Sequence, residues 1–177
     1  MKIILGICGG IAAYKTPDLV RKLVKAEHEI QVVMTHSAHE FVAPLALQTV
    51  SGRPVRSELF DPQAESAMDH IELARWADTL LIAPATAHKI AELAHGMAGD
   101  LLTTLCLAST APLVLAPAMN QQMWAHPATR QNVETLLTRG ARLIGPAQGE
   151  QACGETGYGR MLEPEEIVAA LDGGVTC

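Results

Sequence analysis

Short apolar segments alternate with helical segments along this chain, and this alternation restricts its possible folds more than any other feature. The apolar segments 2–7 and 29–34 flank a segment in which Leu19, Val20 and Leu23 recur at helical spacing. Short apolar strands that alternate with helices are typical of a parallel sheet covered on both faces. The sequence therefore predicts an α/β fold with a three-layer, doubly wound parallel sheet.

The rest of the chain continues the same pattern. We expect strands at residues 2–7, 29–34, 78–83 (ended by Pro84), 113–116 and 141–144, helices at 12–25, 41–50, 86–94, 100–109, 127–138 and 164–171, and a glycine-rich loop at 148–161. No linker or internal repeat interrupts the 177 residues, so we expect one domain that spans 1–177.

Charge and composition exclude several classes of function. The net charge of −6 and the lack of a Lys/Arg cluster argue against nucleic acid as a partner. No apolar run reaches the roughly 18 residues of a membrane span, and the apolar N-terminus reads as a strand rather than a signal peptide. The four cysteines form neither a CxxC metal motif nor a dense disulfide framework. Reduced thiols indicate a cytoplasmic protein.

Unusual residues fall where four of the expected strands end. These are Gly9-Gly10, Thr35–Ser37, Pro84–Thr86 and Pro117–Asn120. In flavodoxin-like and Rossmann-like folds, ligands bind beyond the carboxyl ends of the strands, at one edge of the sheet. We therefore expect a ligand site where these four segments meet.

Several of these residues suit the binding of an anion. Small residues such as Gly9 and Gly10 let a phosphate approach backbone N–H groups, although an ordinary tight turn explains them equally well. The hydroxyls of Thr35, Ser37 and Thr86 add hydrogen-bond donors, and each of these residues also suits a helix cap.

Asn120 and His70 are further candidates. The Asn120 side-chain N–H groups suit a carboxylate, and a helix cap is the alternative. His70 is one of seven histidines, and spacing alone does not distinguish it from a surface or core histidine. His36 and His39 lack a third ligand at a suitable spacing, so we expect no metal site.

Cys153 lies in the glycine-rich segment 152–161. Such glycine spacing favours a mobile lid that closes over a substrate, and a disordered surface loop is the alternative. An exposed thiol on a mobile loop is a liability unless the protein uses it.

Five strings of this sequence resemble one family. They are GGIAAYK, APATA, HIELARWAD, PAMNQQMW and ACGETGYGRM. Together they resemble the homo-oligomeric flavin-containing cysteine decarboxylases over about residues 2–167, and PAMNQQMW followed by ACGETGYGRM is the most specific part. The resemblance is closest to the decarboxylase half of a bacterial bifunctional protein that carries a ligase domain downstream.

The resemblance implies an FMN-dependent enzyme of coenzyme A biosynthesis. It would convert 4′-phosphopantothenoylcysteine to 4′-phosphopantetheine and CO2. The flavin would oxidise the substrate to a thioaldehyde, which accepts electrons as CO2 leaves, and would then return the hydride. The resemblance also implies a homo-oligomer, with trimers assembled into a dodecamer and sites at subunit interfaces.

Roles for individual residues follow from the same resemblance. The catalytic residues would be His70 as base, Cys153 as proton donor and Asn120, which also holds the substrate carboxylate. The implied FMN-binding positions are Gly9, Gly10, Ile11, Thr35, Ser37, Pro84, Ala85 and Thr86. The implied substrate-binding positions are Asn120, Met123, Ala152, Gly154, Arg160 and Met161, and residues 148–163 would form a mobile clamp.

Two positions depart from the family pattern, since many relatives have serine at Gly9 and asparagine is frequent at His88. Two related functions stay open: an FMN prenyltransferase, which needs basic side chains for a prenyl phosphate, and a decarboxylase of a C-terminal peptidyl cysteine. A phosphatase-binding relative would carry acidic tails, and a flavodoxin-like electron carrier would place aromatic residues around the flavin. Aromatic residues make up only 3% of this chain.

Overall fold

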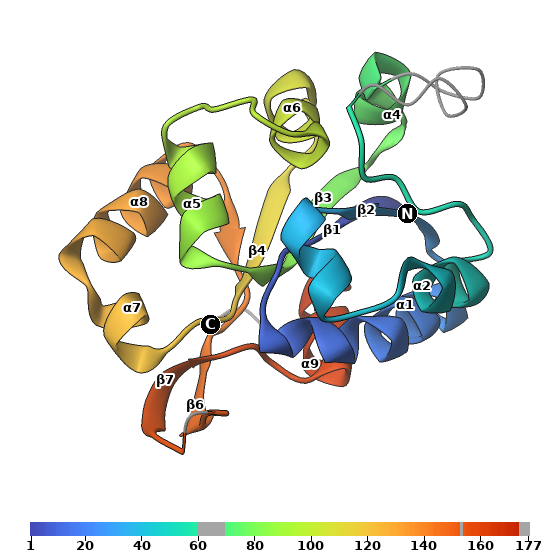
Figure 1. Cartoon of the computed structure of the whole chain (residues 1–177). Coiled ribbons are helices and arrows are strands. Elements are labelled where there is room, and N and C mark those ends of the chain that lie inside the picture. The colour runs from blue at the N-terminus through green and yellow to red at the C-terminus, as the bar shows by residue number, and fades with distance from the viewer. Residues whose placement is uncertain (60–69, 153, 174–177) are drawn as a thin grey trace.

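The computed structural model describes residues 1–59, 70–152 and 154–173, and its centre is a parallel five-stranded sheet (Figure 1). The strands are β1 Lys2–Ile7, β2 Glu29–Met34, β3 Thr79–Ala85, β4 Leu113–Pro117 and β5 Arg142–Leu143. Their order in the sheet is β2-β1-β3-β4-β5, which is the order of flavodoxin-like sheets. The predicted fold class is therefore confirmed.

Helices cover both faces of this sheet (Figure 1). One face carries α1 Thr16–Lys25, α2 Pro44–Ser51 and α9 Pro164–Leu171. The other carries α4 His70–Trp76, α5 Ala87–Ala94, α6 Leu101–Ala108 and α8 Pro127–Thr138. In β1, Ile3 belongs to the first core cluster and Ile4 to the second. Successive side chains of a strand point to opposite faces, so an apolar strand requires cover on both sides.

Strand β3 extends further than expected. It runs through Pro84 to Ala85, and its pairing with β4 shifts register between Ile82 and Ala85. Proline lacks the N–H that a regular ladder uses, and an irregular pairing accommodates it. The prediction that Pro84 ends this strand is therefore wrong.

Two α-helices begin later than predicted, because short 3₁₀ helices precede them. The first helical segment divides into a 3₁₀ helix, η1 Ile11–Lys15, followed by α1. A second 3₁₀ helix, η2 His36–Glu40, precedes α2, which begins at a proline that suits a first turn. The short helix α7 Gln121–Ala125 was not expected. Within the described ranges, no helix is both long and apolar enough to cross a membrane.

The segment expected to be a glycine-rich loop is a β-hairpin instead. Strands β6 Ala147–Glu150 and β7 Thr156–Arg160 pair antiparallel and lie beside α7 at the carboxyl edge of the main sheet (Figure 1). This segment does not alternate apolar with polar residues, so the usual signal of a strand is missing from its sequence.

Candidate active site

A cavity of about 860 Å³ lies beyond the carboxyl ends of β1 and β3. The chain runs from β1 to β2 on one side and reaches β3 on the other, so the cavity lies at the topological switch point where ligands bind in such sheets. Ten of the predicted site residues line it, namely Gly9, Gly10, Ile11, Ser37, Thr86, Asn120, Met123, Ala152, Arg160 and Met161.

The two glycines after β1 differ in how closely other atoms approach them. A Cβ atom at Gly9 would collide with the side chain of Ser37. A Cβ atom at Gly10 would have Thr86 Cγ2 as its nearest neighbour, at 3.9 Å, which is an ordinary contact distance. The structure thus leaves no room for the serine that the family pattern suggested at Gly9, whereas Gly10 has space for a small side chain.

Hydroxyl groups stand beside these glycines. Ser37 Oγ lies 3.3 Å from Thr35 Oγ1, so the two hydroxyls share a hydrogen bond. Thr86 Oγ1 accepts a 3.2 Å hydrogen bond from the backbone N–H of Lys89, which confirms Thr86 as the cap of α5. Thr35 precedes η2 but makes no side-chain cap. Ser37, in η2, and Thr86, at the start of α5, line the cavity from two different segments.

A buried lysine lies behind this wall. Lys89 is only 3% exposed, and its Nζ lies 2.6 Å from both Glu92 Oε2 and Asp100 Oδ2. Asp100 also caps α6 by accepting a hydrogen bond from the Thr103 N–H. Burial disfavours the charged lysine, but its hydrogen bonds to the two carboxylates outweigh burial and raise its pKa. The charged network therefore ties the first turn of α5 to the start of α6.

The opposite wall carries side-chain amides. Asn120 Nδ2 donates to Glu155 Oε2 at 3.0 Å, and Gln121 Nε2 donates to the same oxygen at 3.2 Å. Asn120 Oδ1 accepts from the Gln122 N–H at 2.8 Å, which confirms the cap at the start of α7. The oxygen of the Asn120 amide thus fixes its orientation, and its nitrogen holds a carboxylate.

The hairpin packs closely against the turn before α7. The Met119 N–H donates to Gly159 O at 2.9 Å, and Gln151 Nε2 donates to Met119 O at 3.3 Å. A Cβ atom at Gly159 would collide with Met119 O, and one at Gly157 would collide with the Gln121 side chain. These glycines therefore allow a close approach of the hairpin, a role that their spacing in the sequence does not reveal.

Two cations on the cavity wall share one carboxylate. Lys15 Nζ lies 2.7 Å from Glu163 Oε1, and Arg160 Nη1 lies 3.5 Å from the same oxygen. The Lys15 side chain is 10% exposed, so its ammonium group is held in place rather than free in solvent. Lys15 is part of the GGIAAYK string, but no role was predicted for it, because a helical lysine usually lies on a solvated face.

Four predicted site residues take other positions. Thr35 is buried behind Ser37, and Pro84 and Ala85 are buried in β3. Gly154 lies in the exposed turn between β6 and β7. Thr35, Pro84 and Ala85 therefore support the wall that Ser37 and Thr86 present.

His70 lies outside the cavity lining of its own chain, and the Cys8 thiol is buried. His70 begins α4, which packs against α6, and in the described part of this chain it is not among the residues that line the cavity. Cys153 lies outside the described residues. Burial raises the pKa of the Cys8 thiol to about 12, so Cys8 stays protonated at neutral pH and is a poor source of thiolate.

The fold and the cavity agree with a comparison to known proteins. The Flavoprotein family model matches residues 1–176. The chain belongs to the Flavoprotein family. This flavoprotein is 61% identical over 168 residues to the coenzyme A biosynthesis bifunctional protein CoaBC of Vibrio cholerae. That match covers 95% of this chain but only 42% of the relative, so the chain spans less than half of the bifunctional protein's length.

Two solved structures are similar to this flavoprotein over nearly their whole length. One is a cysteine-to-serine variant of a PPC decarboxylase in complex with pantothenoylaminoethenethiol, with a TM-score of 0.84, 33% identity, and coverage of 97% of this chain and 96% of the other. The second is the FMN binding protein AtHal3, with a TM-score of 0.81, 34% identity, and coverage of 97% and 94%. The family resemblance predicted from the five strings is confirmed.

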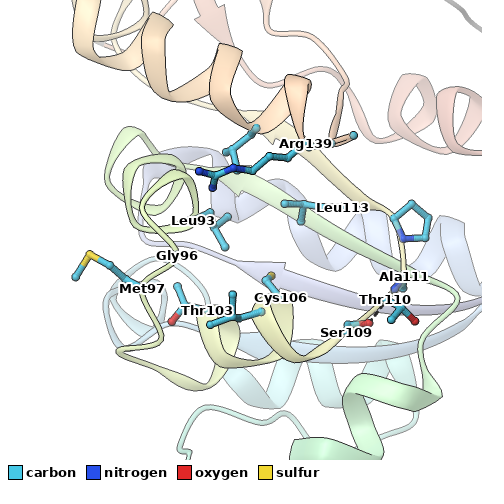
Figure 2. Close-up of a pocket in the computed structure, with 15 residues that line it drawn as sticks. Leu93, Gly96, Met97, Thr103, Cys106, Ser109, Thr110, Ala111, Leu113 and Arg139 are labelled. Carbon is cyan, nitrogen blue, oxygen red and sulfur yellow. Dashed lines mark hydrogen bonds between the residues drawn. The ribbon is translucent and has the colours of Figure 1, made fainter.

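The flavoprotein has a second cavity, of about 490 Å³, near the amino-terminal ends of β4 and β5. Figure 2 shows Leu93, Leu113 and Cys106 around it, with the Arg139 side chain beside Leu93. Arg139 Nη1 donates to the carbonyl of Ala94 at 2.7 Å. Its guanidinium therefore provides a hydrogen-bond donor for a backbone carbonyl at the end of α5.

Proposed function

We propose that this flavoprotein binds FMN in the cavity at the carboxyl edge of the sheet and decarboxylates 4′-phosphopantothenoylcysteine to 4′-phosphopantetheine, a step of coenzyme A biosynthesis. One observation carries the proposal. A single cavity joins a wall of glycines and hydroxyls, including Gly9, Ser37 and Thr86, to the Asn120 amide, which already holds a carboxylate. The first wall suits a phosphate, and the second suits the carboxyl group that the reaction removes.

The residues of the first wall fit FMN. Gly9 and Gly10 leave the backbone accessible, and the hydroxyls of Ser37 and Thr86 can donate to phosphate oxygens. The start of α5 at Thr86 adds a favourable dipole for an anion. The cavity volume falls within the roughly 300–1,000 Å³ that is typical of cofactor sites. Bound FMN would accept a hydride from the substrate and return it after CO2 has left.

The second wall would bind the substrate. Asn120 donates to the substrate carboxylate, with Met123 beside it. Lys15 and Arg160 supply positive charge for the substrate phosphate, and the guanidinium fork of Arg160 suits a phosphate especially well. Glu163 contacts both cations and so restricts their positions.

Proton transfer would fall to His70 as base and Cys153 as donor, each worth about 10²–10⁴-fold in rate. The PPC decarboxylase structure supports the second assignment, because a variant that lacks one cysteine holds pantothenoylaminoethenethiol. An enethiol is expected when CO2 has left but the last proton has not been delivered. Residues 148–163 would act as the substrate clamp of a single decarboxylase domain, 1–177.

We place His70 in the cavity of a neighbouring subunit, because in its own chain it begins a helix apart from the cavity lining. Ile11 and Tyr14, at 59% and 63% exposed, lie at the cavity and offer apolar surface for such an interface. The assembly would be a homo-oligomer, with trimers that form a dodecamer. The compartment would be the cytoplasm, where thiols stay reduced.

Subunit mixing tests this arrangement. His70→Asn and Asn120→Ala chains should each release almost no CO2 alone. A random equimolar mixture should recover about one quarter of the wild-type activity, because each site then draws an intact His70 and an intact Asn120 from different chains. Recovery that stays near zero after subunit exchange would show that both groups act within one chain.

The function itself is tested with purified protein. We expect a yellow preparation with a flavin spectrum that releases CO2 from 4′-phosphopantothenoylcysteine. Dimethylallyl phosphate with reduced FMN tests the prenyltransferase alternative, and a peptide ending in cysteine tests the peptidyl alternative. Turnover of either compound without CO2 release from 4′-phosphopantothenoylcysteine would overturn the proposal.

A further inference from the structure

The carboxylate that Asn120 holds in this structure belongs to the protein itself. Glu155 Oε2 accepts hydrogen bonds from Asn120 Nδ2 at 3.0 Å and from Gln121 Nε2 at 3.2 Å. The backbone carbonyl of Glu155 accepts a 2.8 Å hydrogen bond from the Gln151 N–H within the hairpin turn. The main chain of Glu155 is thus part of the hairpin, while its side chain reaches across to the turn at the start of α7.

We propose that Glu155 competes with the substrate carboxylate for Asn120 and leaves this amide when substrate binds. This inference rests on the proposed function, because it takes Asn120 as the group that binds the substrate carboxylate. Two carboxylates on the same pair of amides would repel each other at contact distance. The substrate carboxylate and Glu155 therefore compete for Asn120.

This competition makes Glu155 a residue that determines specificity. A ligand with a carboxylate can replace Glu155 on Asn120 and release the hairpin turn from α7, whereas a ligand without one leaves that contact intact. Decarboxylation removes the competing group from the ligand. Glu155 then regains the amides, which favours departure of the product.

Glu150 provides a matched control in the same hairpin. It lies on β6 and lines the same cavity as an exposed carboxylate. Its replacement removes one negative charge from the cavity wall, as replacement of Glu155 does, but leaves the Glu155 contact to Asn120 in place. A general electrostatic effect on anionic ligands is thereby separated from release of the amide.

The test uses two unreactive probes and the FMN-loaded protein. The probes are 4′-phosphopantothenoylserine and 4′-phosphopantothenoylethanolamine, which differ only in the carboxylate and lack the thiol that the reaction oxidises. Calorimetry should show that Glu155→Ala tightens binding of the serine probe by about tenfold relative to the ethanolamine probe. The reason is that the probe carboxylate no longer has to displace the Glu155 carboxylate from Asn120. Glu155→Gln should give a smaller change of the same sign, and Glu150→Gln should change the ratio of the two affinities far less than Glu155→Ala, because it leaves Glu155 on Asn120.

Two results would overturn the inference. One is a Glu155→Ala protein that binds both probes more weakly, or with an unchanged ratio, because Glu155 would then only fasten the hairpin. The other is a preference for the serine probe that survives Asn120→Ala in the Glu155→Ala background. The proposed function has its own readout, CO2 release by the wild-type protein. If the wild-type protein releases no CO2 but the probes show the expected ratio of affinities, the proposed function is rejected and the competition between Glu155 and a ligand carboxylate still holds.

Discussion

The two cavities at opposite edges of the sheet differ in what their polar groups already contact. At the amino-terminal edge, Arg139 donates to a backbone carbonyl at the end of α5, and Thr103 donates to the Asp100 carboxylate. Both side chains therefore stabilise the fold. At the carboxyl edge, Asn120 and Gln121 donate to Glu155, an exposed side chain that a ligand can replace. The partners of the polar groups therefore identify a binding site better than the existence of a cavity does.

The largest contrast between the edges should come from Asn120→Ala. We expect kcat/KM for CO2 release to fall by about 10²–10³-fold, because an oriented donor to the reacting group is lost. The thermal midpoint of unfolding serves as the control and should fall by only a few degrees, because Asn120 also caps α7. A decrease of only about twofold would place the carboxylate elsewhere.

Gly9→Ala tests the phosphate wall without relying on turnover. Its Cβ atom would collide with Ser37, so we expect the Kd for FMN, measured by fluorescence titration, to rise by about tenfold or more. Gly99→Ala is the matched control, because a Cβ atom there has open space around it. Equal FMN affinity in the two variants would contradict the placement of the flavin.

Lys89→Met tests the charged network that joins α5 to α6. It leaves the Glu92 and Asp100 carboxylates together without their cation, and we expect a loss of about 2 kcal/mol in the free energy of unfolding by urea at about pH 7.

This loss should depend on pH. Burial disfavours the charged form of the Asp100 carboxyl, but the hydrogen bonds from Lys89 and Thr103 together outweigh burial and lower its pKa below the usual 3.8. Its contribution is therefore present above that value and disappears as the pH falls through the folded pKa. The difference between wild type and Lys89→Met should shrink as the pH falls below 3.8, and a constant difference would contradict the network.

The smallest effect on the reaction is expected from Arg139→Met at the second cavity. The variant should lose about 1 kcal/mol of stability with its hydrogen bond to Ala94, while kcat/KM stays at the wild-type value. A marked loss of CO2 release with unchanged stability would give the amino-terminal edge a part in the function.

The sequence predicted the main sheet well because burial on both faces makes each strand continuously apolar. Strands 2–7 and 29–34 agree residue for residue with β1 and β2. The hairpin was not predicted, because its glycines reflect tertiary contacts. Gln121 packs against Gly157 and Met119 against Gly159, and the local sequence carries no signal of these contacts. Tertiary contacts, not local sequence, decide such positions.

In the candidate site, too, some residues could be predicted from the local sequence and others only from tertiary contacts. Gly9, Gly10 and Thr86 were predicted to converge because the ends of neighbouring parallel strands meet at one edge, and all three line the cavity. Lys15 and the contact of Glu155 with Asn120 depend on how distant segments pack, so their roles came only from the structure. His70 is not among the described residues that line the cavity of its own chain, so the role proposed for it requires a neighbouring subunit.

A crystal structure of the FMN-loaded protein with 4′-phosphopantothenoylserine would show where both ligands bind. We expect the flavin phosphate to lie against Gly9, Gly10 and Thr86, and the probe carboxylate to lie on Asn120 in place of Glu155. A flavin bound near Arg139, or a probe carboxylate away from Asn120 with Glu155 still in position, would contradict this placement.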